Sequence, residues 1–182
     1  VRIAASGYRT AVVDSTTLEE ANVDAINWVR QRSRWYKGYM QSWLVHARHP
    51  RQLIRTIGFV SFYRFTLLIA GTPLIACVNM LFWLLLIVWI TGRPEFVPDL
   101  FWGPTYYLAL VSLIFGNTSV MYMNIIAVRE DGHSELFWST LIVPAYWVMM
   151  SVAALKGMYQ LLRNPSYWEK TFHGLASDEA AS

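Results

Sequence analysis

The sequence predicts a mainly α-helical membrane protein, in which interfacial amphipathic helices are followed by about four transmembrane helices and preceded by the remnant of an α/β domain. Hydrophobic residues make up 55% of the 182 residues and aromatic residues 15%. One soluble domain of this length normally carries fewer aromatic and more charged side chains. Residues 57–92 hold a single charged residue, Arg64, and no Asp or Glu occurs between Ala25 and Pro94. The composition therefore argues against an ordinary soluble domain.

Residues 1–24 carry the pattern of an α/β domain whose beginning lies upstream. Residues 1–8 have the composition of a helix end that closes on Gly7, and residues 10–14 alternate as a short strand does. A helix, a glycine and a strand form one unit of an α/β domain. We therefore expect these residues to be the C-terminal remnant of such a domain.

Residues 25–56 are expected to lie along the membrane surface as amphipathic helices. Apolar and basic positions recur with helical spacing from Val23 to about Arg48, Pro50 interrupts the pattern, and a short basic stretch follows at residues 51–55. Basic residues without acidic partners, placed directly before apolar spans, indicate contact with anionic lipid headgroups on the cytoplasmic side. Nucleic acid is the weaker alternative, because the basic run leads into membrane-spanning sequence and not into a folded reader domain.

Residues 57–163 are expected to form the transmembrane region. One straight helix over residues 57–92 would be about 54 Å long, well beyond the ~30 Å hydrocarbon core, and Gly71-Thr72-Pro73 offers a break. Arg64 is a candidate for a functional charge buried in the membrane, and a snorkelling contact with headgroups is its alternative. The four expected helices cover residues 57–71, 74–92, 104–127 and 135–160.

The pentapeptide QRSRW, residues 31–35, is the most informative motif of the chain. On a helix, Gln31, Arg34 and Trp35 share one face, and Gly38 continues that face without a side chain. An amide, a guanidinium and an indole on one surface suit a ligand with a sugar ring and a phosphate, because Arg pairs with phosphate oxygens and Trp offers a flat apolar face. The alternative is a plain membrane-interface anchor, for which Trp and Arg are also common.

Gln-x-x-Arg-Trp followed by membrane spans resembles the membrane-embedded family 2 glycosyltransferases, which include cellulose, hyaluronan and chitin synthases. Upstream, VRIAASGYRTAVVD is similar to the segment after that family's Thr-Glu-Asp motif, and WYKGYMQSWLVHARHP is similar to bacterial exopolysaccharide synthases. Residues 164–175 are similar to the gating loop of cellulose synthases, whose pattern is Phe-x-Val-Thr-x-Lys-Gly, although Lys170 replaces the Val and His173 the Lys. Residues 176–182 are small and polar and are expected to be disordered.

The resemblance implies a GT-A-like fold for the α/β domain and roles for the residues that match its motifs. Trp35 would bind the acceptor sugar, Arg34 would neutralise the diphosphate leaving group, and Gln31 would hydrogen-bond near the acceptor or near Trp35. The gating-loop-like segment would contact the nucleotide diphosphate through its own side chains and backbone. These expected contacts are Trp168, Lys170, Thr171, His173 and Gly174.

The implied enzyme is not complete in this chain. The family's metal-binding Asp-x-Asp motif and its catalytic base would lie upstream of residue 1, so Mg²⁺ or Mn²⁺ would be held by the full-length enzyme and no catalytic residue or metal ligand is expected here. The expected function is the C-terminal membrane half of a processive glycosyltransferase, which elongates and exports a polysaccharide but is inactive as this fragment alone. A non-catalytic membrane channel or partner module of a separate transferase is the alternative.

The resemblance also implies the partners and the location of the protein. The expected partners are a nucleotide-sugar donor, a polysaccharide acceptor, membrane lipids and accessory polysaccharide-export subunits, and no nucleic acid. The expected location is the bacterial inner membrane, as an integral protein. Cys77 is the only cysteine, so the chain cannot form an internal disulfide.

Overall fold

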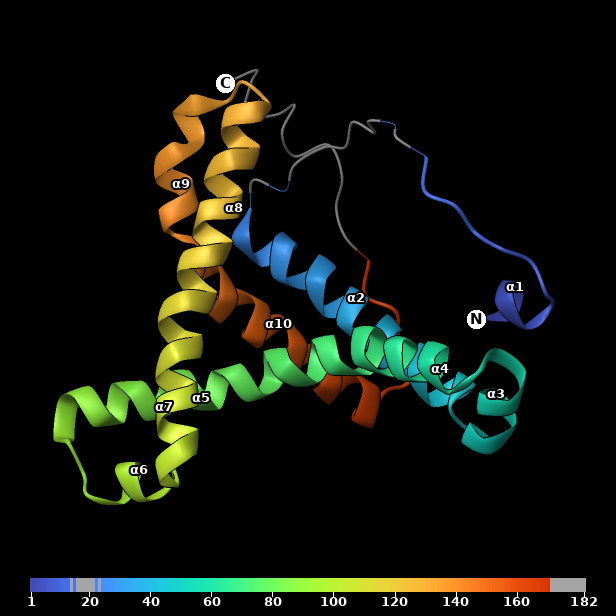
Figure 1. Cartoon of the computed structure of the whole chain (residues 1–182), viewed down its shortest axis with the longest axis horizontal. Coiled ribbons are helices and arrows are strands. Elements are labelled where there is room, and N and C mark those ends of the chain that lie inside the picture. Colours follow the sequence, from blue (N-terminus) through green and yellow to red (C-terminus); the bar gives the residue numbers. More distant parts are fainter. Residues whose placement is uncertain (14, 16–21, 23, 171–182) are drawn as a thin grey trace. The chain divides into compact units, whose positions relative to one another are not determined.

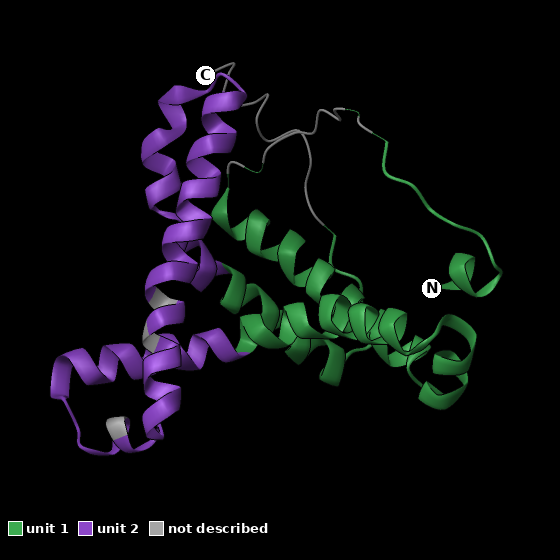
Figure 2. Cartoon of the chain, viewed as in Figure 1, with its two compact units in different colours: residues 1–77, 150–182 green, residues 78–149 purple. Residues whose placement is uncertain are grey.

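The computed structural model describes residues 1–13, 15, 22 and 24–170, without the side chains of Pro98, Leu110 and Leu113. The regular secondary structure of this part is helical (Figure 1). The chain divides into two compact units (Figure 2). Unit 1 comprises Val1–Cys77 and Met150–Ser182, and unit 2 comprises Val78–Met149.

Unit 1 begins with a short helix, α1 (Arg2–Ala5), and the chain turns at Gly7 with a φ of 83°, as the sequence predicts. The strand expected over residues 10–14 is wrong for residues 10–13, which adopt no regular structure, and Asp14 lies outside the described residues. A strand needs a neighbour for its backbone groups, and alternation of side chains alone does not provide one. The described part of residues 1–24 therefore gives no support to an α/β remnant.

Helix α2 (Ala25–His46) confirms the helix expected between Val23 and Arg48. Its first turn is capped by Asp24, whose carboxylate accepts a hydrogen bond of 2.7 Å from the backbone N–H of Asn27. Such a cap satisfies one of the N–H groups that have no partner within the helix.

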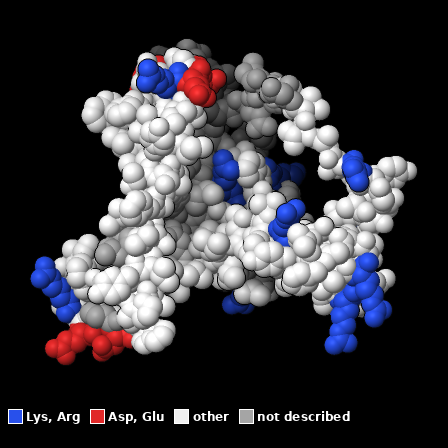
Figure 3. Space-filling model, in the orientation of Figure 1, with Lys and Arg blue, Asp and Glu red and all other residues white. Residues whose placement is uncertain are grey.

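Helix α3 (Pro50–Ile57) confirms the short basic helix expected after Pro50. Proline is suited to the first helical turn, where its missing N–H would have no partner. Arg51 and Arg55 are exposed on one side of α3, and on the face drawn in Figure 3 basic side chains gather around this helix. The helix ends at Gly58, whose φ of 82° a side chain would strain.

Helix α10 (Val143–Arg163) contributes its part from Met150 onward to unit 1, where it packs against α2. A Cβ at Gly157 would lie 2.6 Å from the carbonyl oxygen of Ser33, so only glycine permits this approach of the two helices. Tyr36, Ala153 and Ala154 form the buried core between them.

Phe59–Gly92 is one continuous helix of 34 residues, so the break expected at Gly71-Thr72-Pro73 is wrong. A π-helical turn ends at Gly71, two residues before Pro73, which lacks the N–H for the usual bond to the carbonyl four residues earlier. The helix thus accommodates the proline by widening and not by breaking. Its segments are α4 (Phe59–Thr66), η1 (Leu67–Gly71) and α5 (Thr72–Gly92).

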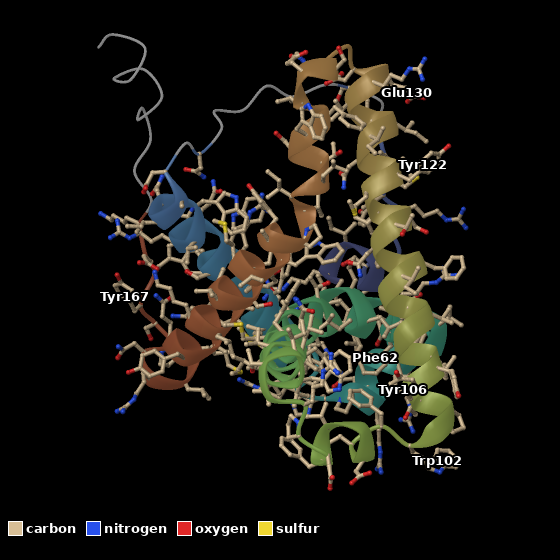
Figure 4. The ribbon with its side chains drawn as sticks, turned by 90° about the vertical axis from the view of Figure 1, so that its left-hand side faces the viewer. Phe62, Trp102, Tyr106, Tyr122, Glu130 and Tyr167 are labelled. Atoms are coloured by element: carbon tan, nitrogen blue, oxygen red, sulfur yellow. The ribbon has the colours of Figure 1, made fainter. Side chains whose placement is uncertain are left out.

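Gly103–Glu130, in unit 2, is a second apolar helix of 28 residues, long and apolar enough to cross a membrane, and it covers the residues 104–127 where a span is expected. Figure 4 shows Trp102 at one end of this helix and Glu130 at the other. Its segments, and the short helix that precedes it, are α6 (Phe96–Asp99), α7 (Gly103–Val111), η2 (Ser112–Gly116) and α8 (Asn117–Glu130).

The span expected over residues 135–160 is broken. The chain bends by 61° between Ser134–Leu141 and Val143–Arg163, because Pro144 lies in the first turn of α10 and cannot continue a preceding helix. The first arm consists of η3 (Ser134–Leu136) and α9 (Phe137–Leu141). The described part thus holds two helices long and apolar enough to cross a membrane, or up to three if the bent pair is one span, and not the four expected. These helices indicate a membrane protein.

Candidate functional site

The QRSRW residues lie on α2 within unit 1, but their side chains do not form one shared surface. Gln31 accepts a hydrogen bond of 2.8 Å from the side-chain amide of Asn22. Arg34 donates a long hydrogen bond of 3.5 Å to the backbone carbonyl of Glu169, and its guanidinium lies 6.0 Å from the ring of Trp168. Trp35 is 41% exposed. Arg34 therefore contacts residues of its own chain, although the sequence predicts that it contacts a bound ligand.

Arg32, and not Arg34, is the guanidinium beside the candidate sugar-binding indole. Its carbon Cζ lies 4.2 Å from the ring centre of Trp35 and 5.3 Å from that of Trp28, within the range of a cation–π contact. Its Nε atom is buried and has no hydrogen-bond partner among the described atoms. The spacing i, i+3 and i+4 does not reveal this pairing, because Arg32 makes its own i−4 and i+3 contacts on the helix.

Lys37 is the buried cation of this region. Lys37 is 1% exposed. Its ammonium donates hydrogen bonds of 2.7 Å to the carbonyl of Asn164 and 2.5 Å to the carbonyl of Tyr167. These carbonyls belong to the turn that follows α10, and a cation at the C-terminal end of a helix also interacts favourably with its dipole. Lys37 thus fixes the chain after α10 against α2. Figure 4 shows Tyr167 in this turn.

Glu169 supplies a carboxylate to helix α2, because the chain has no Asp or Glu of its own between Ala25 and Pro94. Its carboxylate lies 2.9 Å from the ammonium of Lys156 and 3.7 Å from Nε of Arg30, and it accepts hydrogen bonds from Gln160 and Ser33 at 2.9 and 3.4 Å.

These contacts shift the ionisation of Glu169. Burial opposes the charged form, but the hydrogen bonds from Lys156 and Gln160 and the charge of Lys156 outweigh it, so the pKa of Glu169 is lowered from its ordinary value of 4.5. The carboxylate is therefore ionised at neutral pH.

Residues 164–170, here called the docked segment, complete the contact with α2. A Cβ at Gly38 would lie 3.6 Å from the ring of Trp168, so the space left by this glycine is bordered by the chain's own indole. Gln41 donates a hydrogen bond of 2.7 Å to the carbonyl of Pro165. Of the residues expected to contact nucleotide, Trp168 therefore lies against the motif-bearing helix.

Of the other predicted residues, the structure describes Lys170 and Arg64. Lys170 is exposed, and Thr171, His173 and Gly174 lie outside the described residues, as does the predicted disordered tail. Arg64 is exposed in the second turn of the helix Phe59–Gly92, near its start and far from its middle.

Sequence reasoning did not single out the residues that hold this region together. Lys37 lies more than a hundred positions before Lys156 and Glu169, so no local spacing connects it to them. The scarcity of lysine was one available signal, because the chain has three lysines, Lys37, Lys156 and Lys170. Two of them contact the docked segment and the third belongs to it.

The described side chains of this region are suited to binding a ligand. Within the described residues no group of three His, Cys, Asp or Glu side chains is placed to hold a metal ion, so these residues do not fit the Mg²⁺ or Mn²⁺ that the resemblance implies, and no step through a metal is derived for them. What unit 1 offers is a set of guanidinium, ammonium, amide and indole groups around a docked segment. No family model, curated protein or solved structure matches this chain.

Proposed function

We propose that this chain is the C-terminal membrane half of a processive glycosyltransferase that extends a polysaccharide from a nucleotide sugar and moves it across a membrane, with no transfer activity as this fragment alone. The observation that carries the proposal is the docking of residues 164–170 on α2. The resemblance assigns both segments to one active site, and they contact each other although Arg34 and Glu169 lie 135 residues apart.

In the proposed enzyme, this chain supplies binding groups and an upstream domain supplies the metal and the base. The exposed part of Trp35 would cover the apolar side of the acceptor sugar, and burial of about 60 Å² there would contribute roughly 1.5 kcal/mol at ~25 cal/mol/Å². Arg32 would hold the indole in place from the opposite side. Arg34 would turn from the docked segment to the diphosphate leaving group, because a guanidinium matches phosphate oxygens well.

Membrane topology is consistent with this assignment. Because α2 and the docked segment contact each other, they lie on the same side of the membrane, and the chain between them crosses it an even number of times. The helices Phe59–Gly92 and Gly103–Glu130 are long and apolar enough to supply two crossings. On this proposal the bent pair that contains α10 does not cross completely, and the active site faces the cytoplasm of a bacterial cell.

A non-catalytic membrane module for a separate transferase is the second candidate. Two described carboxylates of unit 1 favour this candidate, because both already have partners. Asp24 caps helix α2, and Glu169 pairs with cations. Neither is free to act as a base. The coding sequence upstream of Val1 separates the candidates: an in-frame domain with Asp-x-Asp and Thr-Glu-Asp supports the enzyme, and its absence supports the module.

The test of the proposal is Trp35→Ala in the full-length protein, measured as polymer formed from a panel of labelled nucleotide sugars. We expect the variant to insert into membranes normally and to lose polymer output. Trp89→Ala is the matched control, because Trp89 is similarly exposed, at 43% against 41% for Trp35, and lies in an apolar span. Full polymer output from Trp35→Ala would contradict the proposal.

A further inference from the structure

The carboxylate of Glu169 sits in a cluster of donors that comes from two helices. Arg30 and Ser33 project from α2, and Lys156 and Gln160 project from α10. We call these four residues the α2–α10 cradle. The Glu169 side chain is 14% exposed within it.

The cradle holds more positive charge than one carboxylate balances. Arg30 and Lys156 both lie within 4 Å of Glu169, at 3.7 and 2.9 Å, and the guanidinium of Arg34 reaches the backbone carbonyl of the same residue. Two cations and two neutral donors thus contact one carboxylate, and a third cation contacts the backbone of the same residue. A phosphate or diphosphate group, with more oxygens and more charge, uses such donors more fully than a carboxylate does.

The cradle and its occupant belong to different kinds of structure. The four donors stand on α2 and α10, which are locked together where Gly157 approaches Ser33. Glu169 stands on the docked segment, which has no helix or strand of its own at this residue. The carboxylate can therefore leave while the donors stay in place.

We propose that Glu169 is an internal substitute for an anionic ligand: the α2–α10 cradle binds a diphosphate group, and Glu169 occupies the cradle until that group displaces it. The choice of diphosphate rests on the proposed function, in which a nucleoside diphosphate is the leaving group. The docked segment is then an autoinhibitory contact, which keeps Arg34 and the cradle occupied in the absence of ligand.

Competition makes a quantitative prediction. When only a fraction of the molecules can bind a ligand, the apparent affinity falls by that fraction. If Glu169 fills the cradle in about 90% of molecules, the cradle therefore binds its ligand about tenfold more weakly than an empty cradle does. Glu169→Gln removes the competing charge. We expect it to tighten the binding of anions, although it removes favourable contacts from the folded chain.

The experiment is a titration of the full chain with inorganic pyrophosphate, in nanodiscs of phosphatidylcholine at constant ionic strength, followed by calorimetry. We expect Glu169→Gln to bind pyrophosphate about tenfold more tightly than wild type, and Glu169→Gln combined with Lys156→Gln to lose that gain. Glu135→Gln is the matched control, because it removes one negative charge from an exposed pair with His133 in unit 2. It should leave the affinity unchanged.

A second measurement needs no substitution and so does not depend on the folding of a variant. We expect pyrophosphate to increase amide hydrogen exchange over residues 164–170 of the wild-type chain, because it displaces the docked segment. Unchanged or weaker pyrophosphate binding by Glu169→Gln, or unchanged or slower exchange of this segment, would overturn the inference and leave Glu169 as a structural clamp.

The outcomes separate this inference from the proposed function. If pyrophosphate competes with Glu169 while Trp35→Ala still makes normal polymer, the cradle stands and the glycosyltransferase proposal fails. If Trp35→Ala loses polymer while Glu169→Gln binds pyrophosphate as wild type does, the glycosyltransferase proposal stands and the cradle fails.

Discussion

The two units of the chain are stabilised in different ways. Unit 1 buries polar groups, among them Asn27, Ser33 and Lys37, and its helices are joined by ion pairs and hydrogen bonds to a segment far along the chain. The described residues of unit 2 include few buried side chains, such as Val97 and Thr140, and many exposed large apolar ones. Those exposed residues include Leu108, Phe115, Tyr122 and Trp138.

This difference shows where each unit obtains its stability. Polar groups that are buried and paired specify one arrangement, because an unpaired partner is costly. Exposed apolar helices of membrane-spanning length gain most from lipid, which replaces water around them. The α2–α10 region of unit 1 is therefore the place for a specific site. Unit 2, like the apolar helix that begins in unit 1, is the place for lipid contact, and substitutions in the two regions should have different effects.

The largest effect is expected from Gly157→Leu in unit 1, compared with Gly116→Leu in unit 2. A side chain at position 157 meets the Ser33 backbone at 2.6 Å, whereas nothing lies within 4 Å of a Cβ at Gly116. Overpacking of this kind costs about 3 kcal/mol. We expect the thermal midpoint of the detergent-solubilised chain to fall strongly for Gly157→Leu and little for Gly116→Leu. Equal shifts would remove the distinction between the units.

The next effect concerns the buried ammonium. Lys37→Met leaves the carbonyls of Asn164 and Tyr167 without their donor, at a cost of about 2 kcal/mol. Lys170→Met, at an exposed position, should stay within about 0.5 kcal/mol of wild type. Denaturant unfolding of both variants measures the difference, and a stable Lys37→Met chain would show that Lys37 does not hold the docked segment.

A smaller effect is expected from pH. Because the folded pKa of Glu169 lies below its ordinary value of 4.5, its charged contacts stabilise the fold fully above that value, and this contribution is lost as the pH falls through the lowered folded pKa. We expect unfolding midpoints to decline below about pH 4.5. The part of the decline due to Glu169 should be missing in Glu169→Gln. Identical pH profiles would mean that the carboxylate contributes nothing.

The smallest effect belongs to the indole of Trp43, which donates a hydrogen bond of 3.3 Å to the hydroxyl of Thr66. Trp43→Phe keeps an aromatic ring and removes the donor, so we expect a loss of about 1 kcal/mol or less. Thr66→Val removes the acceptor instead. In a double-mutant cycle the two losses should not add, and full additivity would show that this bond does not connect α2 to the long helix.

Local patterns predicted much of the helical structure and little of the candidate site. The amphipathic period of α2, the position of Pro50 and the apolar run of Gly103–Glu130 are short-range signals, and each predicted its helix. The break at Pro73 failed because a π-helical turn accommodates the proline, which composition does not reveal. The strand at residues 10–13 failed because a strand depends on a partner elsewhere in the chain.

The contacts of Lys37, Lys156 and Glu169 could not be predicted, because they join residues that only the fold brings together. The sequence did carry an indirect sign. With no Asp or Glu between Ala25 and Pro94, any carboxylate that pairs with Arg30 had to come from another part of the chain. The motif residues were predicted on the correct helix, but their side chains have different partners: Asn22 for Gln31, the docked segment for Arg34 and Arg32 for Trp35.

Residues 164–170 dock on the helix that carries QRSRW, and cross-linking between the two segments is the sharpest test of this contact. Gln41→Cys and Ser166→Cys, placed in a Cys77→Ala chain, lie beside the hydrogen bond of 2.7 Å between Gln41 and the carbonyl of Pro165. We expect rapid cross-linking by a short bis-maleimide in membranes, and none for either single cysteine or for the denatured chain. Failure of the native pair to cross-link would contradict it.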